Sequence, residues 1–143
     1  MKEKYLYTMK LQYLGGVGEI FLEKETWHRI FEVPDYVTLE ILSSIIQQIL
    51  GWDESHLYIF KIKNIQHAFM GWDMPVILNL VFKEEKYLSC DIKLKNLNLC
   101  IDEQFFYDYD FGDQQKFSLK IQNKTITKNH PSFPKLLSYN GND

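Results

Sequence analysis

Apolar and polar positions alternate with a period of two over much of the chain. In the first such stretch the alternating residues are Tyr5, Tyr7, Met9, Leu11 and Tyr13. This spacing predicts a β-strand with one buried face. The same period, interrupted by turns, predicts further strands at residues 26–33, 56–63, 87–94, 105–109 and 116–122. Residues 76–82 are apolar on both faces, which is typical of a strand in the middle of a sheet.

A different spacing, of three and four residues, marks one helix. The apolar residues at this spacing are Leu39, Leu42, Ile45, Ile46, Ile49 and Leu50. They form one wide apolar stripe and predict a helix over about 38–50. Thr38 has the side chain of an N-cap, and Gly51 suits the left-handed conformation that ends many helices. The polar residues of this segment are expected to face solvent: Ser43, Ser44, Gln47 and Gln48.

Together these elements predict an α+β fold, a mostly antiparallel sheet of six to seven strands with one main helix packed on it. The length of 143 residues suits a single domain, 1–143. We expect its core within about 5–123 and an irregular C-terminal segment at 124–143. Residues 64–73 are expected to form a loop. Two stretches stay open: 19–25 is a loop or a short edge strand, and 97–101 is a helical turn or a strand.

Composition favours a folded, cytoplasmic protein. Hydrophobic residues make up 45% of the chain, which is too apolar for a disordered protein. No stretch approaches the length of a membrane span and no signal-peptide pattern opens the chain, so we expect no membrane segment. Cys90 and Cys100 lack a metal or redox spacing and are expected to be buried, reduced thiols. We expect no cofactor, and the sequence carries no signal for an oligomeric state.

Charge is unevenly distributed along the chain. The net charge is −3, yet residues 114–143 carry five lysines against one acidic residue. This basic end suggests a nucleic-acid hypothesis, in which Lys116, Lys120 and Lys124 of the C-terminal hairpin bind phosphate groups. The alternative is an ordinary solvated strand face followed by a loose terminus.

Two groups of residues resemble the hallmarks of a known family. The first group is Trp27-His28-Arg29-Ile30, Val33-Pro34, Thr38-Leu39, Ile46-Gln47, Gly51-Trp52 and His56-Leu57-Tyr58-Ile59-Phe60, and the second is Tyr107 to Asp113. They are similar to the plasmid pRiA-type open-reading-frame-three-like family. Its patterns are W-R-R-I-x-V-P, T-L-x-x-L-H, I-Q, G-W, H-L-H-x-F and Y-x-Y-D-F-G-D. The resemblance spans roughly residues 5–137 of this chain.

The resemblance implies an α+β domain carried on plasmids and transposable elements, without an established activity. This chain departs from the family pattern at several positions. Ser43 stands where the family has the histidine of T-L-x-x-L-H, and His28 replaces the first arginine of W-R-R. A tryptophan and a histidine are missing after Asp113, and the usual acidic C-terminal motif is absent. These losses favour binding over catalysis.

Three acidic residues crowd the second hallmark: Asp108, Asp110 and Asp113. Carboxylate oxygens are the ligands that Mg²⁺ and Mn²⁺ prefer, so this group suggests a metal-dependent hydrolase. The alternative is a structural turn, in which these carboxylates accept hydrogen bonds from backbone amides.

A further candidate binding group lies in the first hallmark and consists of Arg29, Trp52 and His56. Arg29 is the only arginine of the chain. It could hold a phosphate or carboxylate bidentately, or pair structurally with Asp108 or Asp110. His56 follows Trp52 at the start of a strand, where it is either a base paired with a carboxylate or a histidine fixed by a backbone acceptor.

These observations lead to three hypotheses. The first is a non-enzymatic interaction module that contacts a protein partner through its sheet and its aromatic residues, with these candidates: Tyr5, Tyr7, Tyr58 and Tyr107. The second is a nucleic-acid-associated protein that uses the lysines of its C-terminal hairpin. The third is a metal-dependent hydrolase built on the three aspartates.

Overall fold

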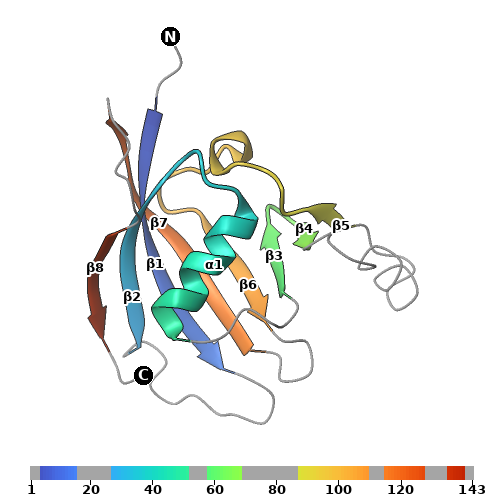
Figure 1. Ribbon diagram of the computed structural model, residues 1–143, viewed down its shortest axis with the longest axis horizontal. Helices are drawn as coiled ribbons and strands as arrows, with labels where there is room; N and C mark the ends of the chain where they lie inside the picture. The colour runs from blue at the N-terminus through green and yellow to red at the C-terminus, as the bar shows by residue number, and fades with distance from the viewer. Residues whose placement is uncertain are drawn as a thin grey trace.

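A computed structural model describes residues 4–15, 27–51, 58–68, 87–109, 115–127 and 135–140. Within these residues the chain forms eight strands, one α-helix and one 3-10 helix (Figure 1). The elements are β1 Lys4–Gly15, β2 His28–Pro34, α1 Leu39–Leu50, β3 Tyr58–Ile62, β4 Ile65–Ala68, β5 Tyr87–Ser89, η1 Leu94–Leu97, β6 Gln104–Tyr109, β7 Gln115–Thr127 and β8 Lys135–Asn140.

The eight strands form one sheet in the order β5-β4-β3-β6-β7-β1-β2-β8. All neighbouring strands are antiparallel except β4 and β5, which are parallel. The α+β class is confirmed, but the predicted sheet was too small, and its edge pair β4–β5 makes it mixed. Helix α1 lies across one face of this sheet (Figure 1). We call that side the helix-covered face and the opposite side the outer face.

Two expected irregular regions contain strands. Residues 65–68, expected to be a loop, form β4 beside β3. The C-terminal segment was expected to be irregular from residue 124, but β7 continues to Thr127 and β8 pairs with β2. Strand β8 depends on a partner far away in the chain, whereas β4 forms a tight hairpin with β3, and the sequences of β4 and β8 carry little alternation. The predicted strand 76–82 and the open stretch 19–25 lie outside the described residues.

The predicted strand 87–94 was too long, and it ends after Ser89. After Ser89 the chain turns and runs past the N-terminus of α1, where its carbonyls accept hydrogen bonds from the first amides of the helix. The amides of Leu39 and Glu40 donate to carbonyls within residues 90–92, at 3.0 and 3.1 Å. The Ile41 amide donates to the Thr38 hydroxyl at 3.1 Å, as the N-cap prediction required. The first amides of a helix have no partner within the helix, so this segment satisfies groups that burial would otherwise leave unpaired.

Helix α1 ends as predicted at Gly51, which has a φ of 71°. The Gly51 amide donates to the carbonyls of Gln47 and Gln48 in the last turn of the helix. Of the stretch 97–101, Leu97 closes the 3-10 helix η1, and the following Asn98 is left-handed. The helical-turn alternative is therefore the correct one at its start.

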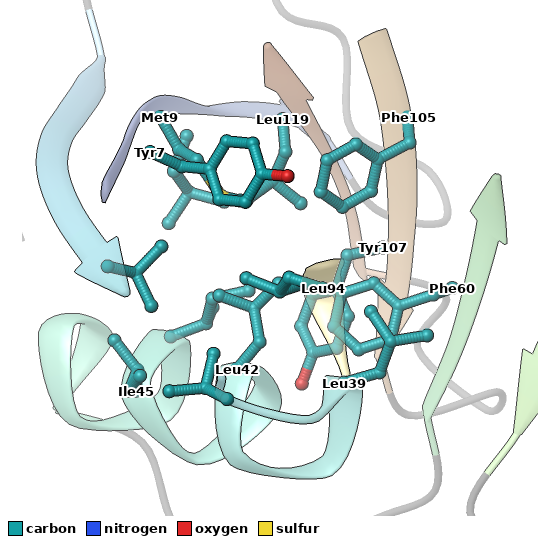
Figure 2. Packing of buried hydrophobic residues seen from close by; sticks show 14 of the residues in the cluster. Tyr7, Met9, Leu39, Leu42, Ile45, Phe60, Leu94, Phe105, Tyr107 and Leu119 are labelled. Carbon is teal, nitrogen blue, oxygen red and sulfur yellow. The ribbon is translucent and has the colours of Figure 1, made fainter. Parts of the chain in front are cut away.

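The core lies between α1 and the sheet. Figure 2 shows Leu39, Leu42 and Ile45 of the helix facing apolar side chains of the sheet. The labelled sheet residues are Tyr7, Met9, Phe60, Phe105, Tyr107 and Leu119, all of them buried. Leu94 of η1 joins the same cluster. Burying each of these side chains stabilises the fold by about 1.5–3 kcal/mol, which explains why the helix stays on this face.

None of the described helices has both the length and the apolar composition that crossing a bilayer requires.

Candidate functional site

A small polar cluster lies buried between helix α1 and the sheet. Its centre is the hydroxyl of Tyr107, which rises from β6 toward the helix (Figure 2). The Ser43 hydroxyl lies 2.7 Å from it, and the Gln47 side-chain amide donates to it at 2.8 Å. All three residues are less than 5% exposed. Ser43, Gln47 and Tyr107 each lie in a hallmark segment of the resemblance, so these segments converge here.

Aromatic rings surround the Tyr107 ring. The ring of Phe60 lies 4.7 Å from it and that of Tyr58 lies 5.8 Å from it, measured between centroids. Burial raises the pKa of Tyr107, and hydrogen bonds from Ser43 and Gln47 oppose this only in part. Burial likewise raises the pKa of Tyr58. Both phenols therefore remain protonated at neutral pH, and the cluster is one of neutral hydrogen-bonding groups.

The cluster corrects two expectations. Ser43 and Gln47 were expected to face solvent, but they lie on the sheet side of the helix. Tyr7 and Tyr107 were candidates for contacting a partner, but both are buried in the core and unavailable for that role. The sequence contained the information needed to place Ser43 and Gln47 correctly. Ser43 and Gln47 follow Leu39 at intervals of four, so they share its face of the helix.

Arg29 is buried on the helix-covered face, and its guanidinium lies 4.3 Å from the ring centroid of Trp27. Its Nη1 donates to the His28 carbonyl at 3.0 Å. The suggested pair with Asp108 does not form. Asp108 lies on the outer face of β6, and strands β7 and β1 separate β6 from β2. Within the described residues, the Arg29 guanidinium therefore stacks on the Trp27 ring and donates a hydrogen bond to a backbone carbonyl. It does not form an ion pair with Asp108.

Asp108 is partly exposed, and one of its carboxylate oxygens lies 3.8 Å from the Lys61 amine. The other members of the predicted acidic group, Asp110 and Asp113, lie outside the described residues. The same holds for Trp52 and His56 of the first hallmark. Among the residues that the structure describes, no three histidine, cysteine or acidic side chains gather to hold a metal ion.

The three lysines of the nucleic-acid hypothesis do not share one face. Lys116 and Lys120 lie on the outer face, opposite Asp108 and Lys10 on the neighbouring strands. The register then shifts, because Gln122 of β7 has no partner between Met9 and Thr8 of β1. Such a bulge reverses the alternation of side chains. Lys124 is therefore opposite Tyr7 on the other face.

The amine of Lys124 is held by the protein itself. It lies 4.5 Å from the ring centroid of Tyr5 and 5.6 Å from that of Tyr7. It also donates to the Leu99 carbonyl at 3.3 Å. Lys124 thus covers the end of the core, whereas Lys116 and Lys120 keep exposed side chains on the outer face.

The two cysteines differ in environment. Cys90 is buried as expected, and burial, with a smaller contribution from Glu40, raises its pKa to about 12. Cys100 was expected to be buried but is exposed in the turn before β6. The error has a local cause: Leu99 takes the inward position at this turn, and the next side chain points outward.

Comparison with known proteins agrees with the hallmark residues. The model of the family described as "Plasmid pRiA4b ORF-3-like protein" matches residues 19–142. The uncharacterized protein y4hQ of Sinorhizobium fredii is 29% identical over 96 residues, which cover 63% of this chain and 43% of that relative. The chain thus matches less than half the length of this curated relative.

A solved structure has the same fold. The crystal structure of MM3350, a protein of unknown function from Methanosarcina mazei Go1, superposes with a TM-score of 0.73. The two chains are 21% identical, and the match covers 97% of this chain and 71% of that one. The hallmark residues, the family match and the shared fold lead to one conclusion: this chain belongs to the plasmid pRiA4b ORF-3-like protein family.

Proposed function

We propose that this chain is a non-enzymatic interaction module that binds a protein partner along strand β8. The hallmark side chains that meet in the core, Ser43, Gln47 and Tyr107, hydrogen-bond to one another and hold the helix to the sheet. Because these buried residues hold the fold together, we assign partner recognition to residues on the surface. This assignment is compatible with the family, in which y4hQ is an uncharacterized protein, and with the shared fold of MM3350, a protein of unknown function.

The observation that carries the proposal is the exposed apolar surface of β8. Leu136 and Leu137 are 46% and 44% exposed, although they are neighbours in a strand. A register shift in the β2–β8 pair, between Ile30 and Phe31, leaves Leu137 without a partner on β2. A bulge re-aims side chains, so both leucines remain accessible on one strand.

The position of β8 supports the same proposal. It is the last strand in the described sheet order and pairs with β2 along one of its edges. Edge strands are common sites for the addition of a partner strand, with side-chain anchors supplying specificity. Two leucine anchors would contribute most of the affinity, since burying each is worth about 1.5–3 kcal/mol.

Site-specific photo-crosslinking in the native host tests this proposal. A photo-reactive amino acid replaces Leu137 in one variant. In a control variant it replaces Ile41, an exposed residue of helix α1. The expected result is a crosslinked protein that is specific to position 137. That protein is then purified and its affinity measured by calorimetry for the wild type and for the L136S/L137S double variant.

We expect the double variant to bind at least tenfold more weakly, whereas I126S, which removes an exposed isoleucine at the end of β7, should bind within twofold of the wild type. Equal crosslinking from positions 137 and 41 would count against the proposal. So would an unchanged affinity of the purified partner for L136S/L137S.

A further inference from the structure

Two lysines face each other across the outer face of the sheet. Lys10 of β1 and Lys120 of β7 are directly opposite in register. Like charges in directly opposite positions destabilise a sheet. Lys120 reaches Asp102 only at 4.0 Å, and both side chains are at least half exposed, so water screens this pair strongly. The arrangement places two lysines side by side in the middle of the sheet, with only this solvent-screened acidic partner.

An exposed aromatic ring lies beside this pair. Phe106 of β6 is 39% exposed and lies on the outer face, opposite Ser118 of β7. Lys116 and Lys120 flank Ser118 at two residues on either side, so both are diagonal neighbours of Phe106. On its other side Phe106 is opposite Lys61 of β3. The ring therefore has lysines around it on two neighbouring strands.

Besides Asp102, which lies near Lys120, the acidic groups on the described outer face are Asp108 and Glu32. Asp108 lies 3.8 Å from Lys61, and it is also opposite Lys116 in register. Glu32 lies at the far side of the sheet, on β2, where it is opposite Lys135 of β8. The centre of the face, around β7, is consequently basic, in contrast to the net charge of −3 of the whole chain.

We propose that this part of the outer face binds single-stranded nucleic acid, with a base stacked on Phe106 and phosphates at Lys10, Lys116 and Lys120. A sheet that presents an aromatic ring among cations is how several domains bind unpaired bases. Single strands fit better than a duplex, because a base must leave its stack to lie flat on the ring. A polyanion also accounts for a lysine pair that costs stability in the free protein.

This inference does not depend on the proposed protein partner, because β8 lies at the edge of the sheet and Phe106 near its middle. It also differs from the site expected from the sequence. Lys10 comes from β1, more than a hundred residues before its neighbour, and Lys124 is excluded because it lies on the other face. Binding should depend on a few contacts and fall steeply with salt.

Fluorescence anisotropy with a labelled 20-nucleotide thymidine oligomer tests the site, using the full chain in 50 mM salt. K10Q/K120Q should weaken binding at least tenfold and reduce the slope of log affinity against log salt by about 1.4, from two lost phosphate contacts. The control K93Q/K95Q changes the same charge at exposed lysines near the start of α1 and should leave affinity within threefold. F106A should weaken binding by roughly 5- to 100-fold, as expected for one stacked base, whereas I126A should not.

Several results would overturn the proposal. These are absence of binding at 100 µM protein, equal losses for K10Q/K120Q and K93Q/K95Q, and tighter binding of a duplex of the same length. Unchanged affinity in F106A would also remove it. If instead a photo-crosslinker at position 106 captures a protein and the oligomer does not bind, the outer face serves a protein partner. Thermal unfolding of each variant verifies that the fold is intact.

Discussion

The hydroxyl of Tyr107 gives the sharpest test of how the helix is held on the sheet. Replacing Tyr107 with phenylalanine removes one oxygen and leaves the ring in place. Ser43 then loses the partner at 2.7 Å, and the amide of Gln47 loses its acceptor at 2.8 Å. Both groups stay buried, but Ser43 keeps a side-chain hydrogen bond with Tyr58, so the unsatisfied Gln47 amide carries most of the cost, about 1–3 kcal/mol. We therefore expect Y107F to lower the free energy of unfolding by about 1–3 kcal/mol.

Urea denaturation followed by far-UV circular dichroism measures this change. The midpoint should fall while the m-value stays constant, because the surface exposed on unfolding is nearly unchanged. The triple variant Y107F/S43A/Q47L replaces the whole cluster with apolar groups of similar size. It should recover at least half of the lost stability, since it also removes the polar side chains of Ser43 and Gln47 that had bonded to this hydroxyl.

A double-mutant cycle between Ser43 and Tyr107 isolates their interaction. We expect a coupling energy of about 0.5–3 kcal/mol, the range seen for residues in direct contact. The reasoning would be refuted if Y107F changed stability by less than about 0.5 kcal/mol, as an ordinary surface substitution does. It would equally fail if the triple variant were less stable than Y107F alone.

Three further predictions concern the helix end, the lysine pair and pH. G51A should cost about 1–2 kcal/mol in urea denaturation, because Gly51 has a φ of 71° and strain alone opposes a side chain in otherwise open space; a neutral result would contradict this. K10Q should raise the free energy of unfolding by roughly 0.2–1 kcal/mol by removing a like-charge pair, and a decrease would show that Lys10 has a stabilising role. His67 is buried and its pKa is lowered by that burial, although a bond to the Ser89 carbonyl opposes the shift. The unfolded chain thus binds the proton more tightly, so stability is full above about pH 6.5 and falls as pH drops below it, by at most about 1.4 kcal/mol per pH unit from this residue. H67Q should flatten this part of the stability profile, and an unchanged profile would refute the assignment.

Local periodicity was enough to locate α1 and most of the described strands. The spacing of Leu39, Leu42 and Ile46 defines the helix without reference to any other part of the chain, and Thr38 and Gly51 mark its two ends. The face alternation of β6 and of the first half of β7 was likewise correct. Such patterns are readable because neighbours within a few residues determine them.

The candidate site was less accessible, since its polar groups look like solvent-facing residues on their own. Ser43 and Gln47 are buried because Tyr107, about 60 residues later, supplies a hydroxyl to them. A polar residue can enter a core only where a partner exists, and the helix sequence does not contain that partner. The hallmark residues could therefore be recognised before the reason for their presence was known.

The sequence by itself determined the helix, the alternating strands and the family. Only the tertiary structure decided which surfaces the chain presents. The bulge at Gln122 sends Lys124 to the opposite face from Lys120, and its position depends on Thr8 and Met9 of another strand. Strand β8 exists because β2, about a hundred residues earlier, offers an edge to it. Periodicity is encoded by adjacent residues, but strand register and edge pairing depend on contacts between segments far apart in the chain.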